Sequence, residues 1–279
     1  MIYRFGNTEY DLFARTYIMG ILNITPDSFS DGGKYFDGNV LLDKVISDAV
    51  RMEKEGADFL DVGGESTRPG SESIDTDEEL RRVIPVIEEL KKKVSIPISI
   101  DTYKHEVAEE ALKAGAVIVN DISGFKFDIE NAEVTAEYNA SCILMHIKGT
   151  PKNMQENPVY ENVVREVYDY LKESADIAKS FGIKQIITDV GIGFGKSLEH
   201  NIELIRNLRK FRDLGYPVLL GVSRKSFINK IIPSSVEDRL EGTISANVAG
   251  IINGANIIRV HDVKENKSAS VITDKILNK

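Results

Sequence analysis

Eight short apolar segments of this sequence each end with a polar residue that could contact a reacting molecule. Side chains of these types donate and accept hydrogen bonds, and the carboxylates among them can also neutralise a positive charge. Between the segments, Leu, Ile, Val and Ala recur at helical spacing. The segments are 17–23, 59–61, 98–101, 117–120, 142–146, 186–189, 218–223 and 257–261, ending in Asn23, Asp61, Asp101, Asn120, His146, Asp189, Ser223 and His261.

A strand and a helix that alternate eight times predict a (β/α)₈ TIM barrel, an α/β fold. In that fold the carboxyl ends of all the strands meet on one face, and this face carries the chemistry. The length of 279 residues suits one barrel, and residues 1–279 are predicted to form a single domain. Residues 1–13 alternate polar and apolar types, which predicts a small N-terminal β-hairpin that turns near Gly6-Asn7 and closes the bottom of the barrel.

The helical pattern covers 41–55, 78–93, 103–114, 161–181 and 197–214. A glycine directly after 103–114, 161–181 and 197–214 suits a helix C-terminus, where a left-handed conformation is needed. Two predicted strand-to-helix connections, 24–40 and 63–77, are long and polar. Long loops on a compact domain tend to be functional or mobile, and both loops fall on the predicted active face.

Composition narrows the possible classes of function. The net charge of −9 argues against a general nucleic-acid binder, which would carry a basic face. No run of about 18 apolar residues is present, so no membrane span is expected, and the first residues lack the apolar core of a signal peptide. The single cysteine, Cys142, cannot form an intrachain disulfide, which favours a reducing cytoplasm.

Seven motifs follow the predicted strands in order, from about residue 17 to residue 262. Together they resemble the dihydropteroate synthase family, although each string alone would be a weak signal. The family usually shows Asp-Pro-Gly after the sixth strand, whereas this chain has Asp189-Val190-Gly191 and loses the fixed φ of proline there. The motifs are MGILNITPDSFSDGG (19–33), DVGGESTRPG (61–70), SIDTYK (99–104), NDISG (120–124), GIGFGK (191–196), GVSRKSFI (221–228) and RVHD (259–262).

The resemblance implies a transferase of folate biosynthesis that is a target of sulfonamides. Its substrates would be 6-hydroxymethyl-7,8-dihydropterin diphosphate and p-aminobenzoate, and its products 7,8-dihydropteroate and diphosphate. The family also implies Mg²⁺ and a homodimer formed through the last helices.

The pterin ring presents an amino group and a ring N–H in a row, which a carboxylate can accept with two hydrogen bonds. Asp189 is assigned this role, and Asp101 and Asn120 would complete the polar edge of the site. An alternative for Asp101 is an N-cap of the helix that follows it.

Two basic residues end the seventh and eighth strands. By resemblance, Lys225 would contact the carbonyl side of the pterin near the p-aminobenzoate site, and Arg259 would stack over one ring face. The alternative for each is a solvated surface charge, which is the usual place for Lys and Arg.

The diphosphate needs hydrogen-bond donors and a cation. Thr67, Arg68, Arg259 and His261 can supply the donors, and Mg²⁺ is the expected cation because phosphate oxygens and water provide most of its ligands. By resemblance, Asn23 contacts the metal; the alternative is that Asn23 caps a turn. Zinc is not expected, because the four histidines and one cysteine show no ligand spacing.

The arylamine site would be built largely by the two long loops. Phe29, Pro69 and Ser223 are expected to form its walls when the loops close. Asp31 would stabilise positive charge that develops on the pterin methylene group, and the alternative for Asp31 is a solvated loop position.

Other interpretations remain to be separated. GIGFGK suggests a nucleotide-binding loop, but the Walker pattern needs a glycine where Val190 stands. His146 is interpreted as a buried barrel residue rather than a catalyst. A barrel that presents methyltetrahydrofolate to a corrinoid protein is the second candidate function, and a non-catalytic pterin-binding protein is the third.

Overall fold

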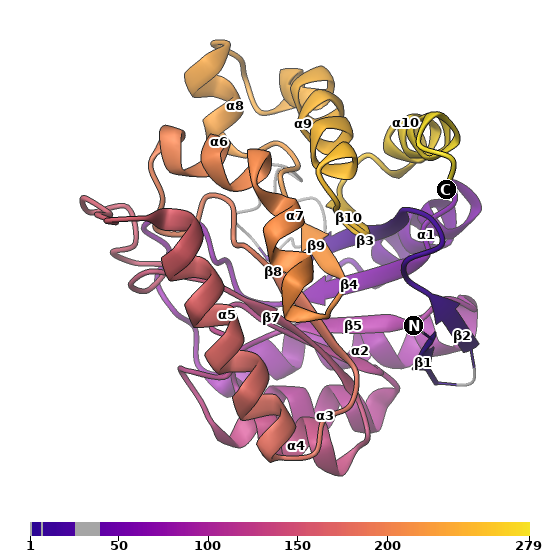
Figure 1. Ribbon diagram of the computed structural model, residues 1–279. Helices are drawn as coiled ribbons and strands as arrows, with labels where there is room; N and C mark the ends of the chain where they lie inside the picture. Colours follow the sequence, from indigo (N-terminus) through magenta and orange to yellow (C-terminus); the bar gives the residue numbers. More distant parts are fainter. Residues whose placement is uncertain (1, 7, 26–39) are drawn as a thin grey trace.

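The computed structural model describes residues 2–6, 8–25 and 40–279 (Figure 1). Within these residues, eight parallel strands close into a barrel in the order β10-β3-β4-β5-β6-β7-β8-β9, so the predicted TIM barrel is confirmed. Closure pairs the first barrel strand with the last, and Tyr17 lies opposite Ile257. The strands are β3 (Tyr17–Asn23), β4 (Phe59–Gly63), β5 (Ile98–Asp101), β6 (Ile118–Asp121), β7 (Ser141–Met145), β8 (Ile186–Asp189), β9 (Val218–Leu220) and β10 (Ile257–Val260).

Helices surround the barrel (Figure 1). The prediction of one helix over 197–214 was wrong, because the chain leaves the helical conformation at Asn207. The Asn207 side chain donates to the Glu203 carbonyl, a local bond that suits the end of a helix. The helices are α1 (Leu42–Lys54), α2 (Thr76–Lys93), α3 (His105–Ala114), α4 (Glu130–Glu137), α5 (Val163–Ser180), α6 (Leu198–Arg206), α7 (Leu208–Phe211), α8 (Ser226–Ile231), α9 (Leu240–Ile252) and α10 (Val263–Ile276), with 3₁₀ turns at Arg212–Leu214 and Glu237–Arg239.

The predicted N-terminal hairpin is present as β1 (Ile2–Phe5) paired antiparallel with β2 (Thr8–Asp11). Asn7 of the predicted turn lies outside the described residues. The hairpin presents Tyr3 and Phe5 to the amino end of the barrel, where both are buried. The Phe5 ring meets Phe59 edge-on at 5.1 Å, and the Tyr3 hydroxyl donates to the Ile186 carbonyl at 2.8 Å. The hairpin therefore seals the bottom of the barrel.

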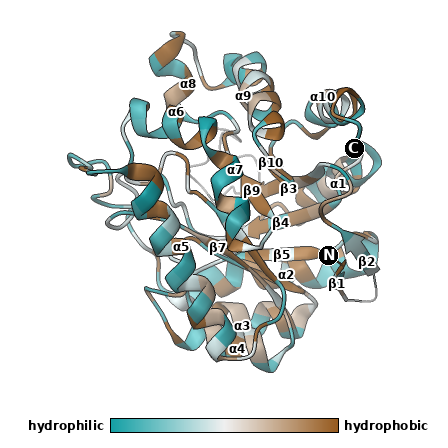
Figure 2. Ribbon diagram, viewed as in Figure 1, coloured by the Kyte–Doolittle hydropathy of each residue, from teal (hydrophilic) through white to brown (hydrophobic). Residues whose placement is uncertain are grey.

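The burial pattern follows from the layered architecture. Parallel strands that helices cover are apolar on both faces, and in Figure 2 the barrel strands are mainly brown while the outer helices carry teal stretches. One large apolar cluster joins the barrel to α1, α2 and α3, and a second joins it to α5 and α6. Val190, the residue that replaces the usual proline, is fully buried in the second cluster. No described helix is long and apolar enough to cross a membrane.

Candidate active site

The carboxyl ends of the barrel strands surround a cavity of about 350 Å³. Every predicted site residue in the described part of the chain lines it, although the strands differ in how far they extend. Strand β9 ends at Leu220, so Ser223 stands in the loop after it. Phe29 and Asp31 lie outside the described residues. The predicted residues that line the cavity are Asn23, Thr67, Arg68, Pro69, Asp101, Asn120, Asp189, Ser223, Lys225, Arg259 and His261.

A guanidinium links carboxylates of the neighbouring strands β4 and β5 on one side of this cavity. Arg259 of β10 donates from Nε to Asp61 Oδ2 at 2.6 Å and from a terminal nitrogen to Asp101 Oδ2 at 2.8 Å. Asn120 donates to the same Asp61 oxygen at 3.0 Å. Only 18% of the Arg259 side chain is exposed, so the surface-charge alternative for this residue was wrong.

The other oxygen of Asp101 is available to a ligand. Asp101 Oδ1 is buried and bonds to none of the described groups, while its residue lines the cavity. Burial raises the pKa of Asp101 to about 7, although the Arg259 charge opposes the shift. The N-cap alternative for Asp101 was wrong, because the first N–H of α3, that of His105, donates to Asp128 instead.

Across the cavity, Asp189 faces Lys225. The N–H of Gly191 donates to Asp189 Oδ1 at 2.8 Å, and the Lys225 ammonium donates to the Ile192 carbonyl at 2.5 Å. Burial raises the pKa of Asp189 against the opposing charge of Lys225. Burial also lowers the pKa of Lys225 to about 8 against the opposing charge of Asp189. The opposite charges of the two groups therefore compensate each other where both are desolvated.

The turn that follows Asp189 packs closely against the end of β7. Gly191 adopts φ 66°, and a Cβ atom there would lie 1.9 Å from the His146 carbonyl oxygen. Glycine is therefore required by the close approach to the end of β7, and Gly191 does not line the cavity. Gly193 does line it, together with Phe194.

Ser223 holds the His261 ring beside the cavity. The His261 backbone N–H donates to Ser223 Oγ at 3.2 Å, and the same oxygen lies 2.9 Å from His261 Nδ1. Burial, with the charges of Arg259 and Arg224, lowers the pKa of His261 to about 3. His261 Nε2 is buried and bonds to none of the described groups, so a ligand in the cavity could satisfy it.

The loop after β4 is held at its root by a buried ion network. Lys104 binds Glu65 and Glu79, the latter at 2.6 Å, and the Tyr103 hydroxyl donates to Glu65 at 2.9 Å. Burial raises the pKa of Glu79 against the Lys104 charge. Because Glu65 stands two residues before Thr67, the network fixes the start of the loop that carries the predicted phosphate donors.

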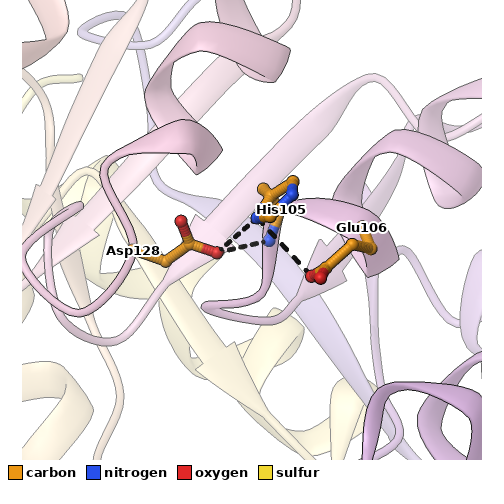
Figure 3. A group of neighbouring side chains, drawn as sticks. All are labelled: His105, Glu106 and Asp128. Atoms are coloured by element: carbon orange, nitrogen blue, oxygen red, sulfur yellow. Dashed lines mark hydrogen bonds and ion pairs between the residues drawn. The ribbon is translucent and has the colours of Figure 1, made fainter.

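The donor set near Asn23 suits a hard cation that a ligand helps to hold. Asn23 offers a neutral oxygen at the end of β3, and the cavity provides hydrogen-bond donors for phosphate oxygens. In the described residues, one cluster of three metal-ligating side chains occurs elsewhere: His105, Glu106 and Asp128 (Figure 3). There, Asp128 Oδ2 already accepts from the His105 backbone and lies 2.8 Å from its ring Nδ1. We interpret this cluster as the cap of α3.

Comparison with known proteins identifies the family. The model of the pterin binding enzyme family matches residues 19–261. The dihydropteroate synthase of Clostridium beijerinckii is 48% identical over 99% of this chain and 100% of its own length. The chain belongs to the dihydropteroate synthase family. Similar solved structures include the Yersinia pestis enzyme with a sulfonamide drug complex (TM-score 0.95, 37% identity, all of both chains) and the Clostridium difficile enzyme in the presence of pteroic acid (TM-score 0.89, 51% identity, 97% of this chain and all of that one).

Dihydropteroate synthases are transferases of folate biosynthesis, and this chain has their fold. Sequence reasoning left Asp61 and Glu65 without roles, although the structure places both beside the predicted residues. Asp61 ends the predicted segment 59–61, so its position was a signal, although β4 continues to Gly63. The partner that makes it matter, Arg259, is 198 residues away and could not be recognised from spacing.

Proposed function

We propose that this dihydropteroate synthase condenses 6-hydroxymethyl-7,8-dihydropterin diphosphate with p-aminobenzoate, giving 7,8-dihydropteroate and diphosphate. One observation carries the proposal: a single cavity combines the acceptors Asp101, Asn120 and Asp189 with a wall of donors. The acceptors suit the N–H groups of a pterin edge, and the donors suit phosphate oxygens. The related enzyme with pteroic acid, which joins both organic parts of the product, supports this reading.

Asp189 would accept from the amino group and ring N–H of the pterin. The free Oδ1 of Asp101 and the side-chain oxygen of Asn120 would accept from the remaining edge. Lys225, already oriented by the Ile192 carbonyl, would donate to the carbonyl side of the ring. In the cavity, where charges are poorly solvated, these bonds would be stronger than in water.

The leaving diphosphate would be bound by donors at the mouth of the cavity. His261 would donate from Nε2, because burial keeps the ring neutral, Ser223 holds it at Nδ1, and Nε2 bonds to none of the described groups. Thr67 and Arg68 would add donors from the loop after β4. Asn23 would hold Mg²⁺, which supplies positive charge to the diphosphate oxygens when it is bound.

Attack by the arylamine requires little acid–base chemistry from the protein. The amine replaces diphosphate at the exocyclic carbon, and negative charge accumulates on the leaving oxygens as the C–O bond breaks. Donors fixed in place before the reaction lower this barrier most effectively. Pro69, Ser223 and Phe29 would position the amine, and Asp31 would face the positive charge that develops on the methylene group.

Diphosphate release, measured with and without p-aminobenzoate, separates this function from its competitors. A condensing enzyme releases diphosphate from the pterin substrate only when the amine is present. A protein that presents methyltetrahydrofolate to a corrinoid protein would release no diphosphate with or without the amine, and neither would a non-catalytic pterin-binding protein. The absence of diphosphate release in the presence of p-aminobenzoate would therefore refute the proposal.

We also propose a cytoplasmic homodimer. Helices α9 and α10 are neighbours, and several of their apolar side chains face solvent: Ile252 (47% exposed), Val271 (56%), Ile272 (63%) and Ile276 (74%). A second copy could cover them. The buried, unpaired Cys142 agrees with a reducing compartment. Sedimentation of the native chain and of the Ile272→Glu variant tests the dimer. The native chain should sediment as a dimer and the variant as a monomer.

A further inference from the structure

The glycine-rich turn after β8, residues 191–195, has a lysine on each side of it. On the cavity side, the Lys225 ammonium donates to the Ile192 carbonyl and lies 4.7 Å from the centre of the Phe194 ring. On the interior side stands Lys196, the residue that made GIGFGK look like a phosphate-binding loop. Lys196 does not line the cavity and is only 1% exposed, so it is placed to act on the turn rather than on a phosphate.

The contacts of Lys196 join this turn to the neighbouring strand. Its Nζ atom donates to the Phe194 carbonyl at 2.9 Å and lies 2.8 Å from His146 Nδ1, with the His146 carbonyl at 3.4 Å. His146 directly follows β7, and its backbone N–H donates to the Asp189 carbonyl at 3.1 Å. A single buried amine thus connects the turn to the end of β7, beside Asp189.

Two groups assigned to the pterin depend on the position of this turn. Gly191 supplies the N–H that fixes Asp189 Oδ1, and Ile192 supplies the carbonyl that fixes Lys225. The other bonds of the turn come from the side of helix α6 and from the loop before α5. Asn201 accepts from the Gly193 N–H, and Gln155 donates to the Gly193 carbonyl. Among the described residues outside β7 and β8, Lys196 is the one whose side chain bonds both to the turn and to the end of β7.

We propose that Lys196 is a positioning residue for pterin binding, holding the 191–195 turn against β7 so that Asp189 and Lys225 keep their orientations. This inference rests on the proposed function, because it needs Asp189 and Lys225 to contact the pterin. Lys196 itself contacts neither substrate.

The environment of Lys196 explains why a hydrogen-bonding role suits it better than a role as a charge. Burial holds the pKa of Lys196 well below its usual range, against the charge of Asp189. Burial also holds the pKa of His146 well below its usual range, and the Lys196 charge acts in the same direction. A polar group buried in this way is maintained by its bonds, and losing them leaves the Phe194 carbonyl without its donor.

The test compares Lys196→Met with Lys196→Gln. Both side chains have nearly the same length and shape, but only glutamine can donate hydrogen bonds to the Phe194 carbonyl and to His146. Titration calorimetry with 6-hydroxymethylpterin, which lacks diphosphate, should give a dissociation constant raised about 10-fold or more by Lys196→Met, with part of the affinity restored by Lys196→Gln. Amide hydrogen exchange in residues 191–195 should be faster in Lys196→Met.

Tyr3→Phe is the matched control for lost stability. It removes a buried hydrogen bond to the same strand, β8, at the opposite end of the barrel. Tyr3→Phe and Lys196→Met should have comparable melting temperatures, while Tyr3→Phe keeps the pterin affinity of the native chain. This result would show that weakened binding in Lys196→Met is not a consequence of lost stability.

The inference is overturned if Lys196→Met binds the pterin as tightly as the native chain, or if Lys196→Gln is no better than Lys196→Met. It is also overturned if Tyr3→Phe loses as much affinity as Lys196→Met. A native chain that binds no pterin would instead refute the proposed function.

Discussion

The two ends of this barrel are built from the same eight strands but differ in the kind of side chains that they bury. At the amino end, Tyr3 and Phe5 of the hairpin pack on Phe59, and the polar atom among them, the Tyr3 hydroxyl, is bonded. At the carboxyl end, carboxylates, lysine, arginine and histidine are buried around a cavity, and Asp101 Oδ1 and His261 Nε2 bond to none of the described groups. The first end maximises apolar contact, whereas the second keeps polar groups ready for a ligand.

This difference teaches where stability and function are separated in the fold. Burial shifts the pKa values of Asp101, Asp189, Lys225 and His261 away from their usual ranges, which means that the folded chain holds these groups at a cost. Aromatic burial at the opposite end helps to offset that cost. Substitutions at the amino end should therefore lower stability and spare activity, whereas substitutions at the carboxyl end should lower activity or binding and spare stability.

The largest effect is expected at the amino end. Phe5→Ala removes a buried ring and leaves a cavity beside Phe59, so the free energy of unfolding should fall by about 3–5 kcal/mol. The kcat/KM of the fraction that remains folded should stay near that of the native chain, because Phe5 is far from the cavity residues. Urea unfolding and steady-state kinetics measure the two quantities. A large loss of kcat/KM with unchanged stability would contradict the assignment of stability to the amino end and function to the carboxyl end.

The reverse signature is expected for Asp189→Asn. The amide would present donors to the pterin's own donors, and losing a buried charged partner costs roughly 2–5 kcal/mol of binding. At about 1.4 kcal/mol per decade, pterin affinity should fall by some tens to several thousand fold. Thermal unfolding should show little loss of stability, because burial disfavours the native carboxylate. Calorimetric binding near that of the native chain would remove Asp189 from its role.

A third comparison divides the carboxyl end itself into ring and leaving-group regions. His261→Ala and Asn23→Ala should each lower turnover by about 10²–10³, because both act where charge grows in the transition state. Neither should change the binding of a pterin without diphosphate, and Asn23→Ala should raise the Mg²⁺ concentration needed for half-maximal rate. Kinetics across a Mg²⁺ titration provide the measurement. Loss of bare-pterin binding with native Mg²⁺ dependence would contradict this division.

The smallest expected effect is on pH dependence. Lys225 supplies a positive charge to the carbonyl side of the pterin only when it is protonated, and its pKa is about 8, so raising the pH from 7 to 8 should lower kcat/KM about two-fold. Stability should change in the opposite direction. Above pH 8 the folded chain releases this proton while the unfolded chain, with an ordinary lysine, retains it until about 10.5, so stability rises with pH in that window.

Urea unfolding at pH 7.5 and pH 9.5 can isolate the contribution of Lys225. The rise in stability between these values should be smaller in Lys225→Met than in the native chain, since the variant has no proton to release. An equal rise in both chains would show that other groups cause it.

Local pattern was enough to predict the eight barrel strands and the face that carries the site. The bounds of β3, β5 and β8 agree with the prediction, whereas β6 and β7 are each displaced by one residue, because the buried polar residues Asp121 and Ser141 pair within the sheet. The helix over 197–214 was predicted as continuous because its apolar spacing continues through Asn207, where a side-chain bond to the backbone ends it.

The site was predictable as a set of residues but not as a set of bonds. Position at a strand end marked Asp101, Asp189 and His261, and the structure places all three around one cavity. The pairing of Arg259 with both Asp61 and Asp101, and the orientation of His261 by Ser223, depend on contacts between distant strands. No single-sequence pattern encodes such contacts, since each residue taken alone could equally be a cap or a surface charge.

The hydroxyl of Tyr3 bonds to the Ile186 carbonyl, and Tyr17 pairs across the sheet with Ile257. These contacts determine when the hairpin can fold during synthesis of the chain. The hairpin leaves the ribosome early, yet its aromatic surface has no complete partner until β8, β9 and β10 have been made. Folds dominated by such distant contacts form slowly, and their incomplete chains expose apolar surface while they wait. The hairpin that seals the finished barrel is therefore the segment of the nascent chain with the longest need for protection from aggregation.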